Sequence, residues 1–147
     1  MTTKIFLIRH GESHQNITDV LSGVTDVPLS EKGKEQCAAL AHYFEDRKIN
    51  KVFASPLQRA KDSTKLIFPK HETLIEFVQS LIEFNYVDYE GYKRSEYDSS
   101  NDRIIQQWIT APSNLTFSGG DNIQEHAQRT LTGITKLADE NKGTILA

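Results

Sequence analysis

A short, uninterrupted run of apolar residues near the start of the chain is the feature that most constrains the fold. Residues 5–8 read Ile-Phe-Leu-Ile and lead directly into Arg9, His10 and Gly11. A strand with one face in water alternates apolar and polar side chains, whereas a strand of a parallel sheet is covered on both faces and is apolar throughout. The run therefore predicts a parallel-sheet strand with Arg9 and His10 at its carboxyl end.

The rest of the chain alternates between strand-like and helix-like segments. Further strands are predicted at residues 51–54, 73–81 and 144–147. Helices with one apolar stripe are predicted from Ser30, from Ser55, over residues 102–111 and from Asn122. Ser55 is expected to cap its helix, with Pro56 at the first helical position. Residues 11–26 are predicted to form a long loop, and residues 83–100 to be irregular.

This order of elements indicates an α/β protein of the three-layer αβα type with a mainly parallel sheet. The length of 147 residues suits one domain, residues 1–147. In such folds, ligands bind at the carboxyl ends of the strands. Two segments therefore become candidates for a site, namely residues 9–11 after the first strand and residues 55–59 after the second.

Composition narrows the range of partners. The 17 Lys and Arg residues against 20 Asp and Glu give a net charge of −3, so no basic field favours nucleic acid. No apolar segment is long enough for a membrane span or a signal peptide. Cys37 is the single cysteine, so no internal disulfide can form, and its place on a helical stripe predicts a core thiol. We expect a soluble, cytoplasmic protein without nucleic-acid or membrane partners, and a homodimer is left open.

The residues at the strand ends suit a phosphate group. The planar guanidinium of Arg9 matches phosphate oxygens, and a neutral His10 imidazole beside it can attack phosphorus. Arg59 lies near the predicted helix start, where free N–H groups also favour anions. Glu83 follows the third predicted strand and could protonate a leaving alkoxide. Each of these residues could also be an ordinary surface side chain, so none is decisive alone.

Two other interpretations of the motifs fit the sequence less well. His10 and His14 bracket a glutamate, as in zinc-binding helices, but the glycine after a strand makes helical spacing unsuitable, so no metal site is expected. A cluster of aromatic side chains could stack on nucleic-acid bases, but it has little positive charge nearby and is better interpreted as a lid over a small-molecule pocket. The cluster comprises Phe84, Tyr86, Tyr89, Tyr92 and Tyr97.

Taken together, the motifs resemble those of the histidine phosphatase superfamily, the phosphoglycerate mutase-like proteins. Residues 9–13, read as RHGES, with Asn16 resemble the signature of that family. Residues 23–33 are similar to its G-x-x-D-x-P-L-[ST]-x-x-G stretch, and residues 55–60 to its S-x-L-x-R-A box. Residues 81–83 and 89–91 resemble L-x-E and W-E-G, and residues 119–122 a degraded G-G-E-S. The match runs in order along the chain.

The resemblance implies a role for each matching residue. It implies that His10 is the nucleophile and that Glu83 is first the acid and then the base for water. The phosphate and substrate would be bound by Arg9, Asn16, Ser22, Gly23 and Arg59. No metal and no cofactor are implied. The expected substrate is a small-molecule phosphate ester.

One departure concerns the C-terminal end of the chain. The family has a second histidine in a V-S-H-G stretch after a strand like residues 144–147, and here the sequence ends at Ala147. His14, His42, His71 and His126 do not lie in that context. We therefore expect the C-terminal part of a phosphoglycerate mutase-like domain to be missing.

Three functions are compatible with these residues. The first is a phosphatase that hydrolyses a small phosphomonoester through a phosphohistidine. The second is a phosphoglycerate mutase, which is disfavoured because Phe84 stands where mutases of this family typically carry arginine. The third is a non-catalytic module that binds a phosphorylated ligand, which the absence of the second histidine favours and the presence of His10 and Glu83 disfavours.

Overall fold

The computed structural model describes residues 3–70, 74–96 and 102–146. Its sheet contains β1 (Lys4–Phe6), β2 (Lys51–Ala54), β3 (Ile75–Phe77) and β4 (Thr144–Leu146). The spatial order is β1-β4-β2-β3, and all three neighbouring pairs are parallel. The predicted parallel α/β sheet is therefore confirmed.

The last strand lies inside the sheet. β4 pairs with β1 on one side, Ile145 opposite Ile5, and with β2 on the other, Ile145 opposite Lys51. The carboxyl ends of β1 and β2 consequently lie on the same edge of the sheet. This arrangement brings together the segments that carry His10 and Arg59.

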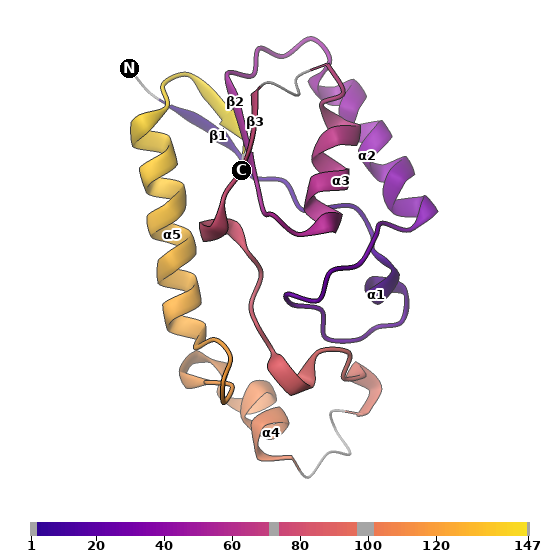
Figure 1. Ribbon diagram of the computed structural model, residues 1–147, viewed down its shortest axis with the longest axis vertical. Helices are drawn as coiled ribbons and strands as arrows, with labels where there is room; N and C mark the ends of the chain where they lie inside the picture. The colour runs from indigo at the N-terminus through magenta and orange to yellow at the C-terminus, as the bar shows by residue number, and fades with distance from the viewer. Residues whose placement is uncertain (1–2, 71–73, 97–101, 147) are drawn as a thin grey trace.

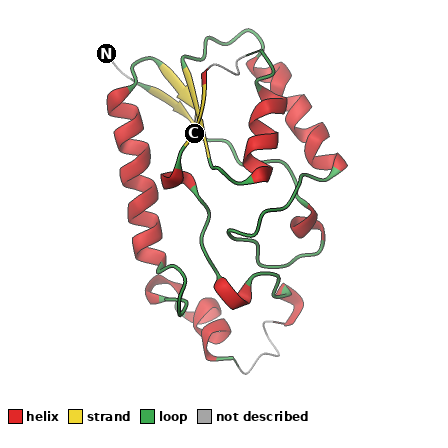
Figure 2. Ribbon diagram, in the orientation of Figure 1, coloured by secondary structure: helices red, strands yellow, loops and turns green. Residues whose placement is uncertain are grey.

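The helices lie on both sides of this sheet. Figure 1 shows α2 (Glu31–Phe44) and α3 (Gln58–Ile67) on one side and α5 (Ile123–Glu140) on the other. Right-handed crossovers explain the division, because the chain moves in one direction from β1 to β3 and in the opposite direction when α5 returns it to β4. The three-layer αβα prediction is confirmed (Figure 2).

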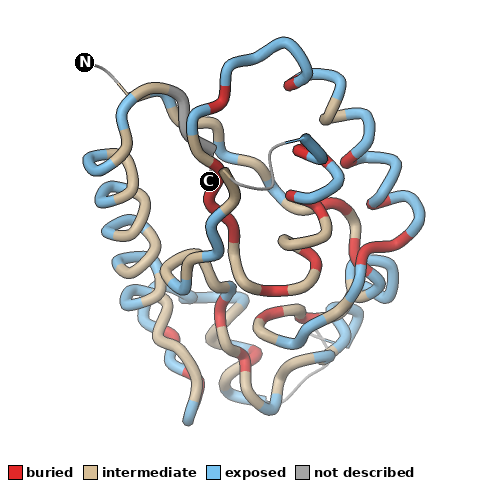
Figure 3. Tube along the Cα trace, turned by 45° about the horizontal axis from the view of Figure 1, so that its top comes forward, coloured by how far each residue is buried: buried red, intermediate tan, exposed pale blue. Residues whose placement is uncertain are grey.

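The first long helix, α2, begins as the sequence predicts. Ser30 is its N-cap, and its hydroxyl accepts a hydrogen bond from the N–H of Gly33 at 3.0 Å. Cys37 and Phe44 are buried in the core cluster beside the sheet. Figure 3 shows buried positions alternating with exposed ones along the chain. Gly33 also lets the chain after β1 approach closely, because a Cβ there would lie 2.1 Å from the carbonyl oxygen of Glu12.

The helix after β2 begins later than predicted. Its first helical residue is Gln58 and its N-cap is Leu57, so the expected cap at Ser55 and helical start at Pro56 are wrong. A carboxylate from another loop replaces the cap, since Asp26 accepts the N–H of Gln58. Leu57 keeps an extended backbone and is only 7% exposed. Burial of Leu57 and the capping by Asp26 thus set the helix start.

Three other segments differ from the sequence prediction in extent. The predicted loop at residues 11–26 contains a short helix, α1 (His14–Ile17), capped by Ser13 and Asn16. The predicted strand at 73–81 is reduced to β3 and is followed by the 3₁₀ helix η2 (Gln79–Leu81). Thr73 lies outside the described residues. The helix predicted over residues 102–111 is α4 (Arg103–Thr110), with Asp102 as its N-cap.

In the part of the chain that the structure describes, the buried hydrophobic side chains form two clusters rather than one. The first packs beside the sheet and includes Leu29, Cys37, Phe44, Val52 and Phe68, so the prediction of a core thiol is confirmed. The second lies among the irregular segment, α4 and the start of α5, and contains Leu21, Phe84, Tyr86, Ile105, Leu115 and Phe117. Ring centroids of Phe84 and Phe117 are 5.5 Å apart.

The second cluster corrects the interpretation of the aromatic residues as a lid. Phe84 and Tyr86 are 4% and 9% exposed, and Tyr89 and Tyr92 pack against the same cluster. These rings therefore form the core that supports the irregular segment. Tyr97 lies outside the described residues. Among the parts of the chain that the structure describes, no helix is both long and apolar enough to cross a bilayer.

Candidate active site

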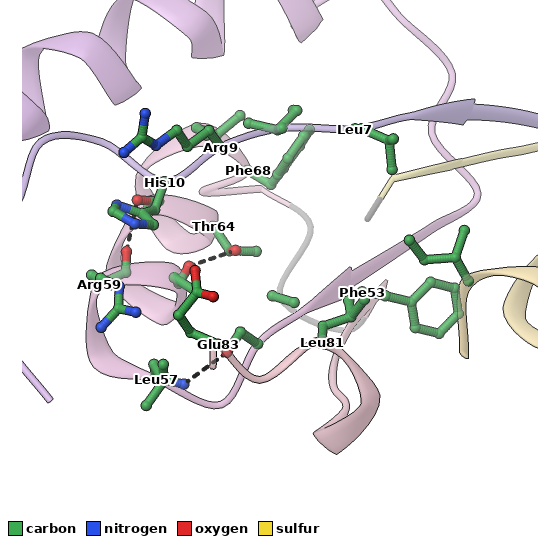
Figure 4. Close-up of a pocket in the computed structure, with 17 residues that line it drawn as sticks. Leu7, Arg9, His10, Phe53, Leu57, Arg59, Thr64, Phe68, Leu81 and Glu83 are labelled. Atoms are coloured by element: carbon green, nitrogen blue, oxygen red, sulfur yellow. Dashed lines mark hydrogen bonds between the residues drawn. The ribbon is translucent and has the colours of Figure 1, made fainter. Parts of the chain in front are cut away.

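A pocket of about 420 Å³ opens at the carboxyl ends of β1 and β2. His10, Arg59 and Glu83 lie toward one end of this pocket, and Leu7, Phe53 and Leu81 lie toward the other (Figure 4). The remaining lining comes mostly from α3 and the segment before it. The structure therefore gathers four predicted site residues, Arg9, His10, Arg59 and Glu83, from three separate segments around one space.

The imidazole of His10 is held by its own loop. Its Nδ1 lies 2.7 Å from the carbonyl oxygen of Gly11. A carbonyl can only accept, so Nδ1 must carry the proton of this hydrogen bond. In the neutral ring, Nε2 therefore keeps a free lone pair, which is what a nucleophilic histidine requires.

The surroundings of His10 favour this neutral form. The pKa of His10 is lowered from its ordinary value of 6.5, first by burial and then by the positive charges of Arg59 and Arg9. The hydrogen bond to Gly11 and the charge of Glu83 act in the opposite direction. Because its pKa is lowered, the imidazole stays unprotonated down to a lower pH, and in that form it is able to attack.

Arg59 is buried rather than a solvated surface arginine. Its exposed fraction is 2%, and its guanidinium donates to the carbonyl oxygens of Gly23 at 2.7 Å and Thr25 at 3.1 Å. Burial lowers the pKa of Arg59, while the carboxylates of Glu83, Asp26 and Glu90 raise it. Two anchored donors fix the orientation of the guanidinium, whose remaining N–H groups suit a tetrahedral anion.

Glu83 reaches the pocket from the chain that follows η2. Its side chain lines the pocket with His10 and Arg59, and the residue is exposed overall. One carboxylate oxygen, Oε1, accepts the backbone N–H of Phe84 at 2.8 Å. This bond leaves the second oxygen available toward the open pocket, where it could exchange a proton with a ligand.

Arg9 and Asn16 lie around a second, more polar hollow of about 420 Å³ beside His10. Arg9 is exposed and lines both hollows. The Asn16 side-chain oxygen accepts from the N–H of Ser13 at 2.9 Å, so its amide NH₂ is the group left to reach a ligand. Arg94 lines the second hollow as well.

Ser22 and Gly23 are engaged with protein groups. The hydroxyl of Ser22 donates to Oε1 of Gln15. The N–H of Gly23 donates to Glu90 at 3.0 Å, and its carbonyl accepts from Arg59. The substrate contacts expected of Ser22 and Gly23 remain predictions. The carbonyl of Gly23 helps to anchor the guanidinium of Arg59.

Sequence reasoning missed two residues that support the site. Ser63 accepts the N–H of Gly11 at 3.0 Å and donates to the carbonyl of Arg59 at 2.7 Å. Glu90 accepts N–H groups from residues 23–25. Glu90 belongs to the segment 89–91 that resembles W-E-G, whereas the only sequence signal for Ser63 is its spacing of four residues from Arg59. In the described parts of the chain, no three His, Cys, Asp or Glu side chains gather as metal ligands would.

A histidine and a buried arginine at the carboxyl edge of a parallel sheet form an arrangement suited to a phosphate group. The family model of the histidine phosphatase superfamily (branch 1) matches residues 5–147. The chain belongs to the histidine phosphatase superfamily, and its resemblance to that family is thereby confirmed.

Relatives in other organisms cover most of this chain. An adenosylcobalamin/alpha-ribazole phosphatase of Salmonella typhi is 26% identical over 134 residues, which cover 91% of this chain and 66% of that protein. An uncharacterized protein of Mycobacterium tuberculosis is 42% identical over 142 residues, covering 96% of this chain and 69% of that protein. The chain thus spans about two thirds of the length of these relatives.

Solved structures share the fold. The alpha-ribazole phosphatase from Shigella flexneri superposes with a TM-score of 0.86 at 23% identity, covering 97% of this chain and 71% of that one. Bacillus stearothermophilus YhfR gives 0.90 at 24% identity, covering 99% and 72%. At these identities the likeness establishes the phosphoglycerate mutase-like fold and no more.

Proposed function

We propose that this protein is a phosphatase that hydrolyses a small-molecule phosphomonoester through a phosphohistidine. The observation that carries the proposal is the geometry of His10. Its Nδ1 is hydrogen-bonded to the carbonyl of Gly11, so Nε2 keeps its lone pair, and the ring lines a pocket shared with Arg59 and Glu83. Membership of the histidine phosphatase superfamily supports the same chemistry. The named relatives include an alpha-ribazole phosphatase and a phosphoserine phosphatase.

In the first step, Nε2 of His10 attacks phosphorus and forms a P–N bond. The bond between phosphorus and the ester oxygen breaks, and the departing alkoxide takes a proton from Glu83. Arg9 and Arg59 hold the phosphate oxygens as charge shifts toward the leaving group. Because Arg59 is already fixed by two carbonyls, little reorganisation is required of it during the reaction.

In the second step, water replaces the alcohol. The Glu83 carboxylate removes a proton from water, whose oxygen attacks phosphorus as the P–N bond breaks. Inorganic phosphate leaves, and His10 and Glu83 return to their starting protonation. Every step uses side chains of the protein and water, so we propose a metal-independent reaction, with Asn16, Ser22 and Gly23 contributing substrate contacts.

Two alternatives lead to different measurements. A phosphoglycerate mutase would transfer phosphate between carbons of phosphoglycerate, and a binding module would take up phosphate without turnover. Phe84 disfavours the mutase, because its buried apolar ring occupies the position after the acid. The location in the cytoplasm and the absence of nucleic-acid partners remain proposals from composition, and a homodimer remains open.

Hydrolysis of p-nitrophenyl phosphate tests the proposal. We expect release of nitrophenol and phosphate that persists in the presence of a metal chelator and is lost in His10→Ala. Transfer between phosphoglycerate carbons without net phosphate release would identify a mutase. Phosphate binding without any turnover would identify a binding module.

A further inference from the structure

The carboxylate of Glu90 lies against the backbone of the loop that follows Leu21. Its two oxygens accept the N–H groups of Gly23 and Val24, both at 3.0 Å, and of Thr25 at 3.3 Å. The N–H of Tyr86 donates to the same carboxylate at 3.3 Å. Four backbone donors thus converge on one anion, and hydrogen bonds to a charged acceptor are stronger than neutral ones.

The other side of this loop holds Arg59. The carbonyls of Gly23 and Thr25 accept from its guanidinium at 2.7 and 3.1 Å. The N–H groups of residues 23–25 therefore face an anion, while two carbonyls of the same stretch face a cation. The loop separates Glu90 from Arg59 and contacts both.

One peptide unit connects the two charges directly. The carbonyl of Gly23 and the N–H of Val24 belong to the same planar peptide and point in opposite directions. That carbonyl accepts from Arg59 and that N–H donates to Glu90. Hydrogen bonds linked in this way polarise one another, so each strengthens the other.

Gly23 is the residue that permits so close an approach. A Cβ at this position would lie 1.9 Å from the carbonyl oxygen of Phe84 and 2.3 Å from Oε1 of Glu90. The contact with the Phe84 carbonyl could be relieved only by moving the backbone, and the contact with Oε1 would displace the carboxylate of Glu90. The absence of a side chain at Gly23 therefore allows Glu90 to reach the loop that anchors Arg59.

We propose that Glu90 is a positioning residue that holds the guanidinium of Arg59 in its phosphate-binding orientation through the peptide between Gly23 and Val24. This inference rests on the proposed function, in which Arg59 binds the phosphate. Glu90 touches neither the substrate nor His10 in this scheme. Its effect must therefore pass through Arg59, and it disappears when Arg59 is absent.

A double-mutant cycle tests this dependence. Glu90→Gln keeps the size of the side chain but replaces one acceptor oxygen with an NH₂ that must face N–H donors. We measure the affinity for inorganic phosphate by calorimetry and kcat/KM for p-nitrophenyl phosphate. We expect Glu90→Gln to weaken phosphate binding by about tenfold or more, and to cause no further loss in the Arg59→Ala background.

Controls separate this role from a purely structural one. Asp88→Asn removes an exposed carboxylate two residues earlier and should leave both measurements unchanged. Equal losses from Glu90→Gln in the wild-type and Arg59→Ala backgrounds would contradict the inference. If Glu90→Gln does not fold, Glu90→Asp replaces it in the cycle, and we expect a smaller loss that again vanishes without Arg59.

The two measurements also separate this inference from the proposed function. Phosphate binding that needs Arg59 and Glu90 together, without turnover of any phosphate ester, would overturn the proposed phosphatase and leave the inference standing. Turnover with additive effects of the two substitutions would do the reverse. A wild-type protein that neither binds phosphate nor hydrolyses the ester would overturn both.

Discussion

The hydroxyl of Ser63 accepts the backbone N–H of Gly11 at 3.0 Å and donates to the carbonyl of Arg59 at 2.7 Å. Ser63 lies in α3 and is 3% exposed, so this hydrogen bond joins the helix that carries Arg59 to the loop that carries His10. The buried hydroxyl of Ser63 therefore links the segments that carry His10 and Arg59.

Ser63→Ala should weaken that connection. The buried N–H of Gly11 loses its acceptor, which costs about 1–3 kcal/mol of unfolding free energy. Chemical denaturation measures the loss, and kcat/KM should fall because His10 moves relative to Arg59. Ser113→Ala, at an exposed serine, is the matched control. Unchanged stability in Ser63→Ala would show that the hydrogen bond contributes nothing.

Arg59→Ala should remove stabilisation of the charge that develops on phosphate. The loss of one preorganised donor group costs about 3–4 kcal/mol in the transition state, or roughly 10²–10³ in rate. Arg59→Lys should recover only part, because an ammonium lacks the planar fork of donors. Steady-state kinetics measure the effect, with Lys65→Ala on the exposed side of α3 as control. Kinetics like those of wild type in Arg59→Ala would remove this residue from the site.

Glu83→Gln should discriminate between substrates by their leaving groups. An alkyl phosphate needs a proton on its departing oxygen, whereas nitrophenolate leaves without one. We therefore expect a large fall in kcat for alkyl phosphates and a small one for p-nitrophenyl phosphate. Glu76→Gln, an exposed glutamate in β3, should change neither rate. Equal losses on both substrates would mean that Glu83 orients the site without transferring a proton.

The environment of His10 predicts a pH dependence. Burial and two arginines lower the pKa of His10 below 6.5, so the neutral nucleophile persists to lower pH. The acidic limb of kcat/KM should have its midpoint below 6.5, and NMR titration of the ring should give the same value. The unfolded chain binds a proton at higher pH than the folded chain, so stability falls as pH decreases from 6.5 toward the folded pKa. A midpoint above 6.5 would contradict the described environment.

Much of this arrangement could be predicted from local patterns. The apolar run before Arg9 indicates a strand, and the stripe containing Cys37 indicates a helix. Both patterns are informative because buried positions recur with a characteristic period in each kind of element. Parallel strands place their carboxyl ends on one edge of the sheet, so the proximity of His10 and Arg59 could be predicted from the sequence. Glu83 was placed by its motif, and the structure puts its side chain in the same pocket.

Features that depend on distant contacts could not be predicted. The helix α3 begins at Gln58 because Asp26, 32 positions earlier, caps it. The helix α1 has four residues, too few to establish a period. The buried state of Phe84 depends on α4 and on Phe117, which no local pattern around residue 84 contains. The hydrogen bonds of Glu90 with residues 23–25 likewise join residues more than 60 positions apart.

Direct trapping of the covalent intermediate is the measurement that tests the central claim. A substrate labelled in its phosphoryl group is mixed with the protein, and the reaction is stopped with detergent at neutral pH. Separate samples are then exposed to base, which preserves phosphohistidine, and to acid, which hydrolyses it. Peptide mass spectrometry then locates the label. We predict phosphate on His10 and none in His10→Ala. The labelled intermediate should last longer when a poorer nucleophile replaces water. Label on serine, threonine or aspartate, or turnover in His10→Ala, would contradict the account.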